Sequence, residues 1–276
     1  MKGYLDAVCD IARAAGRIQM KRRHDAHRIE FKGAINLVTE VDHECEAMIV
    51  AELSRLFPGD DILAEEGSGG RSASGRRWIV DPLDGTVNYA HGFPFFCVSI
   101  ALEEGGELAS GVIYDPNRDE LFAAKKGRGA TMNGERIAVS VSSALSQSLL
   151  ATGFAYNVQE EERLDNLDNF CRFVKSARAV RRPGSAAIDL AWVACGRIDG
   201  FWELFLKPWD MAAGVAIIRE AGGRVTSFDG GPFNLYGTEV LASNGAIHGE
   251  MTGVLVGTQG TQSKQGQQGQ QGEKRS

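Results

Sequence analysis

The sequence predicts a layered α/β protein with two halves of different character. In about the first 145 residues, two helix-like segments are followed by strand-like segments joined by short turns. In residues 146–256, strands alternate with helices, which is typical of a layered α/β unit. The 276-residue chain is 43% hydrophobic, which is enough apolar material for a sizeable core. We therefore expect a single folded unit over residues 1–256, with halves at 1–145 and 146–256.

Two helices are expected at the start of the chain. Apolar residues recur at helical spacing from Leu5 to Met20. The second helix is expected to begin at Asp42, which can serve as its N-cap, and to end before Pro58-Gly59. Residues 24–35, between the two helices, are expected to form a polar link.

Short strands and tight turns follow in the first half. Runs typical of strands occur at 61–64, 78–80, 95–103, 108–114 and 120–124. Asn133-Gly134 is typical of a type I′ hairpin turn, because both residues adopt positive φ readily. The Gly- and Ser-rich stretch 67–75 is expected to be a surface loop. This half should therefore contain a largely antiparallel sheet.

The second half should alternate between strands and helices. Strands are expected at 149–153, 179–180, 200–204, 225–228 and 240–242. Helices are expected at 160–174, 185–195, 210–221 and 246–256. Residues 257–276 are rich in Gln and Gly and contain no apolar side chain, so we expect a disordered tail there.

Composition argues against several classes of function. The net charge of −6 gives no general attraction to nucleic acid or to an anionic membrane surface. No apolar run reaches the length of a membrane span, and the N-terminus lacks the apolar core of a signal peptide. The five cysteines are dispersed without a CxxC pair, which indicates reduced thiols in a cytoplasmic protein.

The segment around Asp81 is the most distinctive part of the sequence. An apolar run directly before it is expected to form a buried strand that ends at Asp81-Pro82, because proline cannot donate to a sheet ladder. Asp81 and Asp84 then lie three residues apart, followed by Gly85 and Thr86. Crowded carboxylates repel each other unless a cation such as Mg²⁺ lies between them. The same residue types also form ordinary turns, so this segment alone leaves both interpretations open.

Three further acids stand at comparable places. Glu65 and Glu66 follow a predicted strand, and Asp210 opens a predicted helix. Taken singly, the two glutamates could be surface charge, and Asp210 could be an N-cap. Strand ends and helix starts are also where α/β folds place ligand sites. Acids gathered from these segments would form a carboxylate cage for several metal ions.

The sequence offers no competing catalytic set. The five histidines lack the spacing of a zinc site, and no GxSxG nucleophile motif occurs. The glycine-rich segments lack the GK[ST] ending of a phosphate-binding P-loop. Oxygen-rich metal chemistry remains, and the substrate that Mg²⁺ most often serves is a phosphate.

Two stretches resemble the signatures of a known family. Residues 81–89 resemble the DP[IL]DGTxN[FY] signature of the inositol monophosphatase family, whose members are Mg²⁺-dependent, lithium-sensitive phosphatases. Residues 208–214 resemble its second signature, WDxAAG. Shorter pieces occur in the family's order at 36–42, 65–67, 184–187 and 199–203. The resemblance extends from about residue 4 to residue 256 and is to the bacterial type of the family.

This resemblance implies an αβαβα five-layer sandwich and a cytoplasmic homodimer. It also implies a site that holds about two to three Mg²⁺ ions. The implied metal ligands are Glu65, Asp81, the backbone carbonyl of Leu83, Asp84 and Asp210.

By the same resemblance, catalysis would be direct attack of a metal-activated water on phosphorus, without a covalent intermediate. Thr86 and Glu65 would orient or deprotonate this water, and Asp42 would hydrogen-bond to Thr86. Backbone N–H groups at Gly85 and Thr86 would bind the phosphate. The implied substrate-binding residues are Leu83, Asp84, Gly85, Thr86, Ala186, Glu203 and Asp210.

The implied substrate is myo-inositol 1-phosphate. Glu203 stands where inositol-type members bind ring hydroxyls, and Ala186 stands where they contact the sugar. Sister groups hydrolyse histidinol phosphate, fructose 1,6-bisphosphate or 3′-phosphoadenosine 5′-phosphate. A bisphosphate would need more basic residues, for which Lys207 and Arg181-Arg182 are candidates.

A regulatory protein that kept the fold, for instance one that partners a nucleic-acid machine, is an alternative from another class. The candidate acids are all present in the sequence, which favours an active phosphatase. Direct nucleic-acid binding is not expected of a chain with a pI near 5.5.

Overall fold

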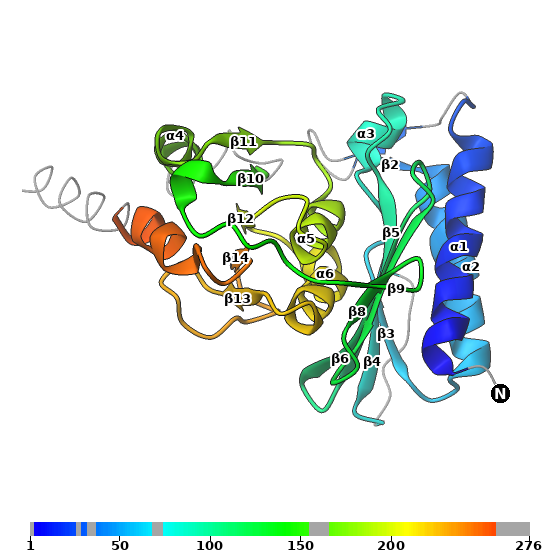
Figure 1. Ribbon diagram of the computed structural model, residues 1–276. Helices are drawn as coiled ribbons and strands as arrows, with labels where there is room; N and C mark the ends of the chain where they lie inside the picture. Colours follow the sequence, from blue (N-terminus) through cyan, green and yellow to red (C-terminus); the bar gives the residue numbers. More distant parts are fainter. Residues whose placement is uncertain (1–2, 26–28, 32–36, 68–73, 155–165, 258–276) are drawn as a thin grey trace, which may run out of the picture.

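In the computed structural model, helices and sheets alternate in five layers (Figure 1). The structure describes residues 3–25, 29–31, 37–67, 74–154 and 166–257. The first layer consists of α1 (Tyr4–Arg22) and α2 (Glu40–Leu56), which pack on one face of a seven-stranded sheet.

The remaining layers come from the second half of the chain. α5 (Ala186–Ala194) and α6 (Pro208–Glu220) lie between the seven-stranded sheet and a five-stranded sheet (Figure 1). α4 (Leu167–Ser176) and a helix at 248–257 cover the outer face of the smaller sheet. The predicted αβαβα sandwich is therefore confirmed.

The seven-stranded sheet has the order β3-β4-β5-β6-β7-β8-β9. β3 and β4 run parallel, and the other neighbouring pairs are antiparallel. The strands are β3 (Asp61–Ala64), β4 (Arg76–Asp84), β5 (Cys97–Glu104), β6 (Glu107–Asp115), β7 (Glu120–Lys125), β8 (Ala130–Met132) and β9 (Glu135–Ile137).

The five-stranded sheet has the order β11-β10-β12-β14-β13 and is mixed. β10 is parallel to both of its neighbours, whereas β14 is antiparallel to β12 and β13. The strands are β10 (Leu149–Thr152), β11 (Ala179–Arg181), β12 (Gly200–Leu204), β13 (Arg224–Thr226) and β14 (Glu239–Ser243). A short 3₁₀ turn, Leu145–Gln147, leads into this sheet.

Apolar side chains fill each gap between layers. Leu53 of α2 and Trp78 of β4 belong to the core under α1 and α2. Phe122 of β7 and Ile188 of α5 belong to the central core. Trp202 of β12 lies in the outer core, and its ring packs against that of Phe173 at a centroid distance of 4.0 Å. Burial of these three cores is the main stabilising term of the fold.

Turn chemistry predicts the β8–β9 hairpin correctly. Asn133 and Gly134 have φ of 51° and 86°, as a type I′ turn requires. The neighbouring Met132 pairs with Glu135, so the two-residue turn fixes the register of the hairpin.

The prediction that the central strand ends at Asp81-Pro82 is wrong. β4 continues to Asp84, and its register with β5 shifts between Asp81 and Asp84. A bulge tolerates a residue that cannot donate to the ladder, so Pro82 fits inside it. The Pro82 carbonyl accepts a hydrogen bond from Nε2 of buried Gln19 at 2.8 Å. The bulge therefore re-aims the two aspartates without ending the strand.

The N-cap predicted at Asp42 is also wrong, and so is the alternative interpretation of Asp210 as an N-cap. α2 begins after Thr39, whose N–H donates to Asp42 Oδ2 at 2.9 Å. α6 begins after Lys207, whose N–H donates to Asp210 Oδ2 at 2.6 Å. Each aspartate lies three residues after the cap and reaches back to it, as an acid does in a capping box. Asp42 keeps its other oxygen, Oδ1, for the Thr86 hydroxyl at 2.9 Å.

The remaining expectations concern connections and chain ends. The link at 24–35 contains β1 (Ile29–Phe31), which pairs antiparallel with β2 (Leu37–Thr39), so the structure adds a short hairpin there. The helix expected at 160–174 is α4, and the start of that prediction, with most of the 67–75 loop, lies outside the described residues. The tail at 258–276 also lies outside them. Among the described helices, none is both long and apolar enough to cross a membrane.

α6 lies unusually close to the seven-stranded sheet. A Cβ on Gly111 of β6 would stand 2.4 Å from the carbonyl oxygen of Ala213. A Cβ on Gly214 would stand 2.4 Å from Cβ of Leu190 in α5. The small residues after Asp210 therefore allow α6 to bring that acid close to the sheet edge.

Replacing Gly111 with Ala should lower the free energy of unfolding by about 1–3 kcal/mol, because the new methyl group overlaps backbone of α6. Urea unfolding monitored by tryptophan fluorescence measures this change. The matched control is Gly249→Ala, where no atom lies within 4 Å of the added methyl and no loss of stability is expected. Equal stability of the two variants would contradict the close packing.

His248 is a buried polar residue of the outer layer, with 1% of its surface exposed. Nδ1 lies 2.8 Å from the Ser243 hydroxyl and Nε2 lies 2.8 Å from the Thr226 hydroxyl. Burial lowers the pKa of His248 to about 4, from an ordinary value of 6.5. Between these two pH values the unfolded chain binds a proton that the folded chain does not, so stability falls as the pH falls.

The lowered pKa of His248 should therefore reduce the free energy of unfolding by up to about 3 kcal/mol as the pH decreases from 6.5 to 4. In urea unfolding between pH 7.5 and 4.5, His248→Gln should show a smaller loss of stability than the parent. His43→Gln, at an exposed position, is the control and should follow the parent. Identical pH dependence in all three proteins would contradict this role of His248.

Candidate active site

Parallel pairing of β3 and β4 brings two acids to one edge of the seven-stranded sheet. Ala64 pairs with Val80, so the residues that follow, Glu65 and Asp81, lie at the same level of the sheet. The N–H of Glu65 donates to the Val80 carbonyl at 3.2 Å, which holds this end of β3 against β4. The edge is the carboxyl end of both strands, where open sheets bind ligands.

Three carboxylates converge at this edge. Asp81 and Asp84 of β4 and Asp210 of α6 each offer one oxygen within 4.8 Å of the others. Glu65 lines the same cavity and raises the pKa of Asp81 and Asp210 through its charge, although it lies outside the 4.8 Å group. Four of the acids that the sequence singled out therefore line one cavity, and three of these lie in mutual ligand range. Glu66, the fifth, does not line it.

Burial and repulsion oppose the ionised forms of these acids. Burial raises the pKa of Asp81 well above its ordinary value, and the charges of Glu65, Asp84 and Asp210 raise it further. Asp81 is only 1% exposed. Burial also raises the pKa of Asp210, with the charge of Asp84 as the next cause. A divalent cation among them would stabilise all four carboxylates in ionised form.

Asp84 is held in a fixed orientation by α5. Its Oδ2 accepts hydrogen bonds from the Ser185 hydroxyl at 2.6 Å and from the Ala187 N–H at 2.7 Å. Burial raises the pKa of Asp84 to about 6, and these donors oppose that increase. Both donors reach Oδ2, so Oδ1 can serve a cation without losing them. The N-terminus of α5 thus orients one candidate ligand.

The turn after Asp84 requires glycine. Gly85 has φ of +96°, and a Cβ there would stand 2.8 Å from the Phe95 carbonyl oxygen. The turn opens the short helix α3 (Thr86–Ala90), whose first N–H groups have no acceptor within the helix. N–H groups in such a turn can bind the oxygens of a phosphate.

Thr86 and Asp42 form a hydrogen-bonded pair behind this turn. Thr86 Oγ1 lies 2.9 Å from Asp42 Oδ1, with the Leu83 carbonyl as a second acceptor at 3.1 Å. Asp42 is fully buried, and its Oδ2 accepts from the N–H and hydroxyl of Thr39 at 2.9 and 2.6 Å. Because the Thr86 hydroxyl can donate to either of these acceptors, the lone pairs of Oγ1 are free to accept a hydrogen bond from a water molecule.

The cavity extends from the acids toward the five-stranded sheet and has a volume of about 530 Å³. Glu203 of β12 lies at its far side, 8% exposed, and Ala186 lies at the start of α5. A Cβ on Gly153 would stand 2.2 Å from both carboxylate oxygens of Glu203, so only glycine leaves room for this acid. Of the predicted site residues, Asp42 lies behind Thr86, and the lining residues are Glu65, Asp81, Leu83, Asp84, Gly85, Thr86, Ala186, Glu203 and Asp210.

The sequence analysis missed Asp189, which also lines this cavity. Asp189 lies on α5, is 2% exposed, and its Oδ1 has no hydrogen-bond partner among the described residues. Burial raises the pKa of Asp189 well above its ordinary value, and Glu203 and Asp84 raise it further, whereas Arg182 lowers it. A signal was present, because this is the one acid in an otherwise apolar helix.

Gln19 and Asn88, which hold the turn in place, were also missed. The side-chain amide of Gln19 donates to the Pro82 carbonyl. The backbone carbonyl of Gln19 accepts a hydrogen bond from the Tyr89 hydroxyl at 2.8 Å. The amide nitrogen of Asn88 donates to the carbonyls of Phe95 at 2.8 Å and Pro183 at 2.9 Å. The signal for Gln19 was a polar residue on the apolar face of α1.

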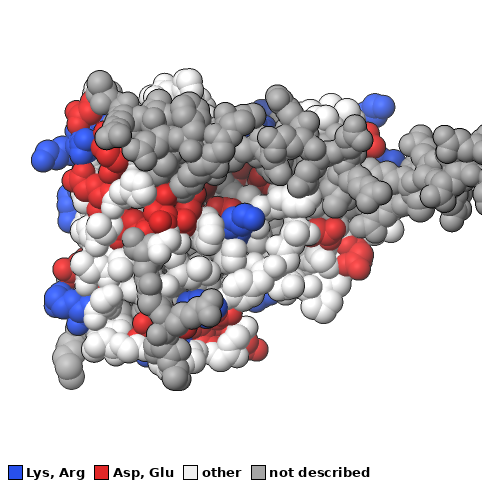
Figure 2. Space-filling view, turned by 180° about the vertical axis from the view of Figure 1, so that it is seen from behind, with Lys and Arg blue, Asp and Glu red and all other residues white. Residues whose placement is uncertain are grey.

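Figure 2 shows the face opposite to that in Figure 1. Acidic side chains gather in one area of this face, whereas the Lys and Arg side chains of the described residues lie apart from one another. A surface that binds nucleic acid gathers its basic residues instead. The charge distribution on this face therefore suits cation binding better than binding to nucleic acid.

Comparison with known proteins gives a consistent result. Residues 2–261 match the inositol monophosphatase family. The chain is 44% identical over 264 residues to an inositol-1-monophosphatase of Synechocystis sp., which covers 94% of this chain and 90% of the relative. It is 41% identical to Nus factor SuhB of Pseudomonas aeruginosa, with 88% of this chain and 92% of the relative covered.

A solved structure of inositol monophosphatase from Anabaena (Nostoc) sp. PCC 7120 has the same fold. The sequences are 44% identical, and the TM-score is 0.84. The match covers 92% of this chain and 95% of that chain.

Asp81→Asn tests whether the acids form a cation site. The amide removes one repelling charge but keeps an oxygen that accepts from the Leu83 N–H, which donates to Asp81 Oδ1 at 3.0 Å. With a chelator present, the variant should be at least as stable as the parent. Saturating Mg²⁺ should stabilise the parent by about 2–3 kcal/mol and the variant by much less.

Thermal unfolding with and without Mg²⁺ measures these differences. The control is Glu135→Gln, an exposed acid of β9 far from the cavity, which should respond as the parent does. A variant that loses stability in chelator yet gains the full Mg²⁺ effect would contradict the cation site.

Proposed function

Because the chain belongs to the inositol monophosphatase family, we propose that it hydrolyses myo-inositol 1-phosphate to inositol and phosphate in a Mg²⁺-dependent reaction. Its relatives are phosphatases, so the reaction class follows from the family. The observation that carries the proposal is one cavity that combines the Asp81, Asp84 and Asp210 cluster with Glu203 at its far side.

The donor set fits a hard divalent cation. It consists of carboxylate oxygens and a backbone carbonyl, which are the ligands that Mg²⁺ prefers. We propose that Glu65, Asp81, Asp84, Asp210 and the Leu83 carbonyl hold two to three Mg²⁺ ions. When bound, Mg²⁺ would offset the charge of the acids and stabilise negative charge on the phosphoryl oxygens.

The chain's own groups would then orient the reactants. The N–H groups of Gly85 and Thr86 would bind the phosphate. Oγ1 of Thr86, whose hydroxyl can donate to Asp42, would accept a hydrogen bond from the attacking water. Glu65 would help to remove a proton from the same water. In-line attack requires the alcohol to leave on the opposite side of phosphorus, toward the part of the cavity that contains Glu203.

The polyol part of the cavity favours an uncharged, hydroxyl-rich group. Glu203 and Asp189 can accept hydrogen bonds from ring hydroxyls, and the backbone of Ala186 would contact the ring. Burial raises the pKa of both acids well above the ordinary value, neighbouring carboxylates raise it further, and the charge of Arg182 only partly opposes this. A second phosphate would bring further negative charge beside these buried acids, and a monophosphate is therefore favoured.

A second candidate is hydrolysis of a bisphosphate such as fructose 1,6-bisphosphate or 3′-phosphoadenosine 5′-phosphate. The observation in its favour is that Arg182 and Lys207 both line the cavity. Histidinol phosphate is a third possible substrate from the same superfamily. A regulatory role is suggested only by the name of the Pseudomonas aeruginosa relative, and the retained acids favour hydrolysis.

The family resemblance supports further proposals about the protein as a whole. We propose a single phosphatase unit over residues 1–256 that forms a homodimer, is inhibited by lithium and acts in the cytoplasm. The shared central core, with side chains such as Phe122 from the first half and Ile188 from the second, supports a single unit.

Phosphate release from inositol 1-phosphate, fructose 1,6-bisphosphate, histidinol phosphate and 3′-phosphoadenosine 5′-phosphate tests the substrate. With Mg²⁺, inositol 1-phosphate should give the highest kcat/KM of the four, and Li⁺ should inhibit its turnover. A panel in which inositol 1-phosphate is the poorest substrate would contradict the proposal.

Glu203→Gln should raise KM for inositol 1-phosphate by about 10- to 100-fold, because a neutral amide is a weaker hydrogen-bond acceptor for ring hydroxyls than a carboxylate. Turnover of phenyl phosphate, which has no ring hydroxyls, should change little. Glu135→Gln is the control and should match the parent on both substrates. Equal losses on the two substrates would show that Glu203 supports the fold or the metal site instead of the polyol.

A further inference from the structure

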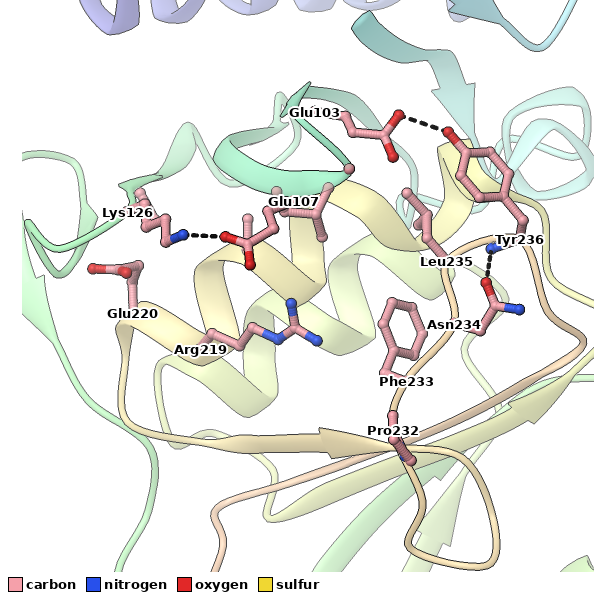
Figure 3. Close-up of a pocket in the computed structure, with 14 residues that line it drawn as sticks. Glu103, Glu107, Lys126, Arg219, Glu220, Pro232, Phe233, Asn234, Leu235 and Tyr236 are labelled. Atoms are coloured by element: carbon pink, nitrogen blue, oxygen red, sulfur yellow. Dashed lines mark hydrogen bonds and ion pairs between the residues drawn. The ribbon is translucent and has the colours of Figure 1, made fainter. Parts of the chain in front are cut away.

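A second cavity lies at the other end of α6 from the acids. Its volume is about 620 Å³, within the range of about 300–1,000 Å³ that is typical of small-molecule sites. Asp210 is in the first turn of α6 and Arg219 is in the last, so about 13 Å of helix separates the two residues. The walls are the β5–β6 hairpin, the last turn of α6 and the segment 232–236 (Figure 3).

The three acids that line this cavity already have partners. Glu103 accepts a hydrogen bond from the Tyr236 hydroxyl at 2.7 Å. Glu107 forms an ion pair with Lys126. Glu220 accepts from three consecutive backbone N–H groups, at 127–129, with distances of 2.7–3.0 Å. Each carboxylate therefore already has a donor or a cation as its partner.

Arg219 differs from these charged neighbours. Its guanidinium has no hydrogen bond or ion pair to any residue in the part of the chain that the structure describes. It lies 5.6 Å from the centre of the Phe233 ring and points into the cavity between that ring and Glu107 (Figure 3). The Arg219 side chain is exposed to solvent at the cavity. Contact with the cavity wall lowers its pKa, and the charge of Glu107 opposes this. An anion beside the guanidinium would supply the hydrogen-bond acceptors that the cavity wall does not give it.

Part of the remaining wall is apolar. Leu108, Ala216, Phe233 and Leu235 line the cavity, and Leu235 is largely buried. One unpaired guanidinium, stacked on an aromatic ring and next to an apolar wall, matches a ligand with a planar oxyanion and an apolar body.

We propose that this cavity binds a small organic monocarboxylate, with its carboxylate on Arg219 and its aromatic or aliphatic body against Phe233 and Leu108. A guanidinium binds a carboxylate through two parallel hydrogen bonds, which suits a single planar acid group. A phosphate dianion would bring a second negative charge close to Glu103 and Glu107, which line the same cavity. The site does not depend on which phosphate ester the enzyme hydrolyses.

Benzoate is a suitable probe, because it combines one carboxylate with an apolar ring. Calorimetry or ligand-observed NMR on the Mg²⁺-loaded full chain should show saturable binding with a Kd of about 1 mM or below. Benzamide, its uncharged analogue, should bind at least about 10-fold more weakly, and phenyl phosphate should also bind more weakly than benzoate.

Arg219→Gln should weaken benzoate binding by about 10-fold or more, since the charged hydrogen bonds are lost. Phe233→Leu should weaken it to a smaller extent, because an apolar group remains. The matched control is Arg128→Gln, which removes an exposed positive charge near the same end of α6 but not from the cavity. This variant should bind as the parent does, and melting curves should show that all three variants fold.

Three outcomes would overturn the proposal. The first is the absence of saturable benzoate binding. The second is unchanged binding by folded Arg219→Gln, which would place benzoate elsewhere, for instance at the acids near Asp210. The third is tighter binding of phenyl phosphate than of benzoate that also depends on Arg219, which would show that the cavity selects a phosphate.

Discussion

Mutual repulsion among the buried carboxylates at one sheet edge is the constraint on which the active-site structure depends. Glu65 and Asp81 arrive there because β3 and β4 are parallel and in register, and Asp84 follows from the bulge that contains Pro82. Asp210 is brought in by α6. Burial and the neighbouring charges raise the pKa values of these acids. The surrounding chain must therefore hold the carboxylates together against their mutual repulsion when no cation is bound.

Groups outside the cluster supply that fixation. Gln19 holds the Pro82 carbonyl, and the Glu46 carboxylate accepts from the Glu66 N–H at 2.7 Å next to Glu65. Ser185 holds Asp84 from α5. These contacts come from different layers of the sandwich, so the geometry of the site depends on the whole fold. A site built in this way is pre-organised for a cation, at the expense of stability in its absence.

Local patterns in the sequence predict the layers and most of the site, because strand runs, helical spacing and turn residues act over a few positions. The Asn133-Gly134 hairpin and the helix that carries Asp210 are examples. Strand termination at Pro82 was predicted wrongly, because a bulge formed with β5 removes the need for its donor. The N-cap interpretations were wrong because Asp42 and Asp210 reach back from the third position.

Other features depend on contacts between distant segments and leave only weak traces in the sequence. Asp189 lies near Glu203 because α5 packs on the five-stranded sheet. Arg219 lies near the Phe233 ring because the segment that follows β13 runs back past the end of α6. A polar residue in an apolar helix is a signal for the first, whereas nothing local indicates the second. α6 links the two cavities, with Asp210 at one end and Arg219 at the other.

The most direct test of the account is Mg²⁺-dependent phosphate release by Asp84→Asn, with a melting curve of the same preparation. The variant keeps an oxygen for the Ser185 and Ala187 donors but removes a charge that the cation requires. We expect at least about 100-fold loss of Mg²⁺-dependent turnover with cooperative unfolding retained. Turnover close to that of the parent would contradict the assignment of this carboxylate cluster as the metal centre.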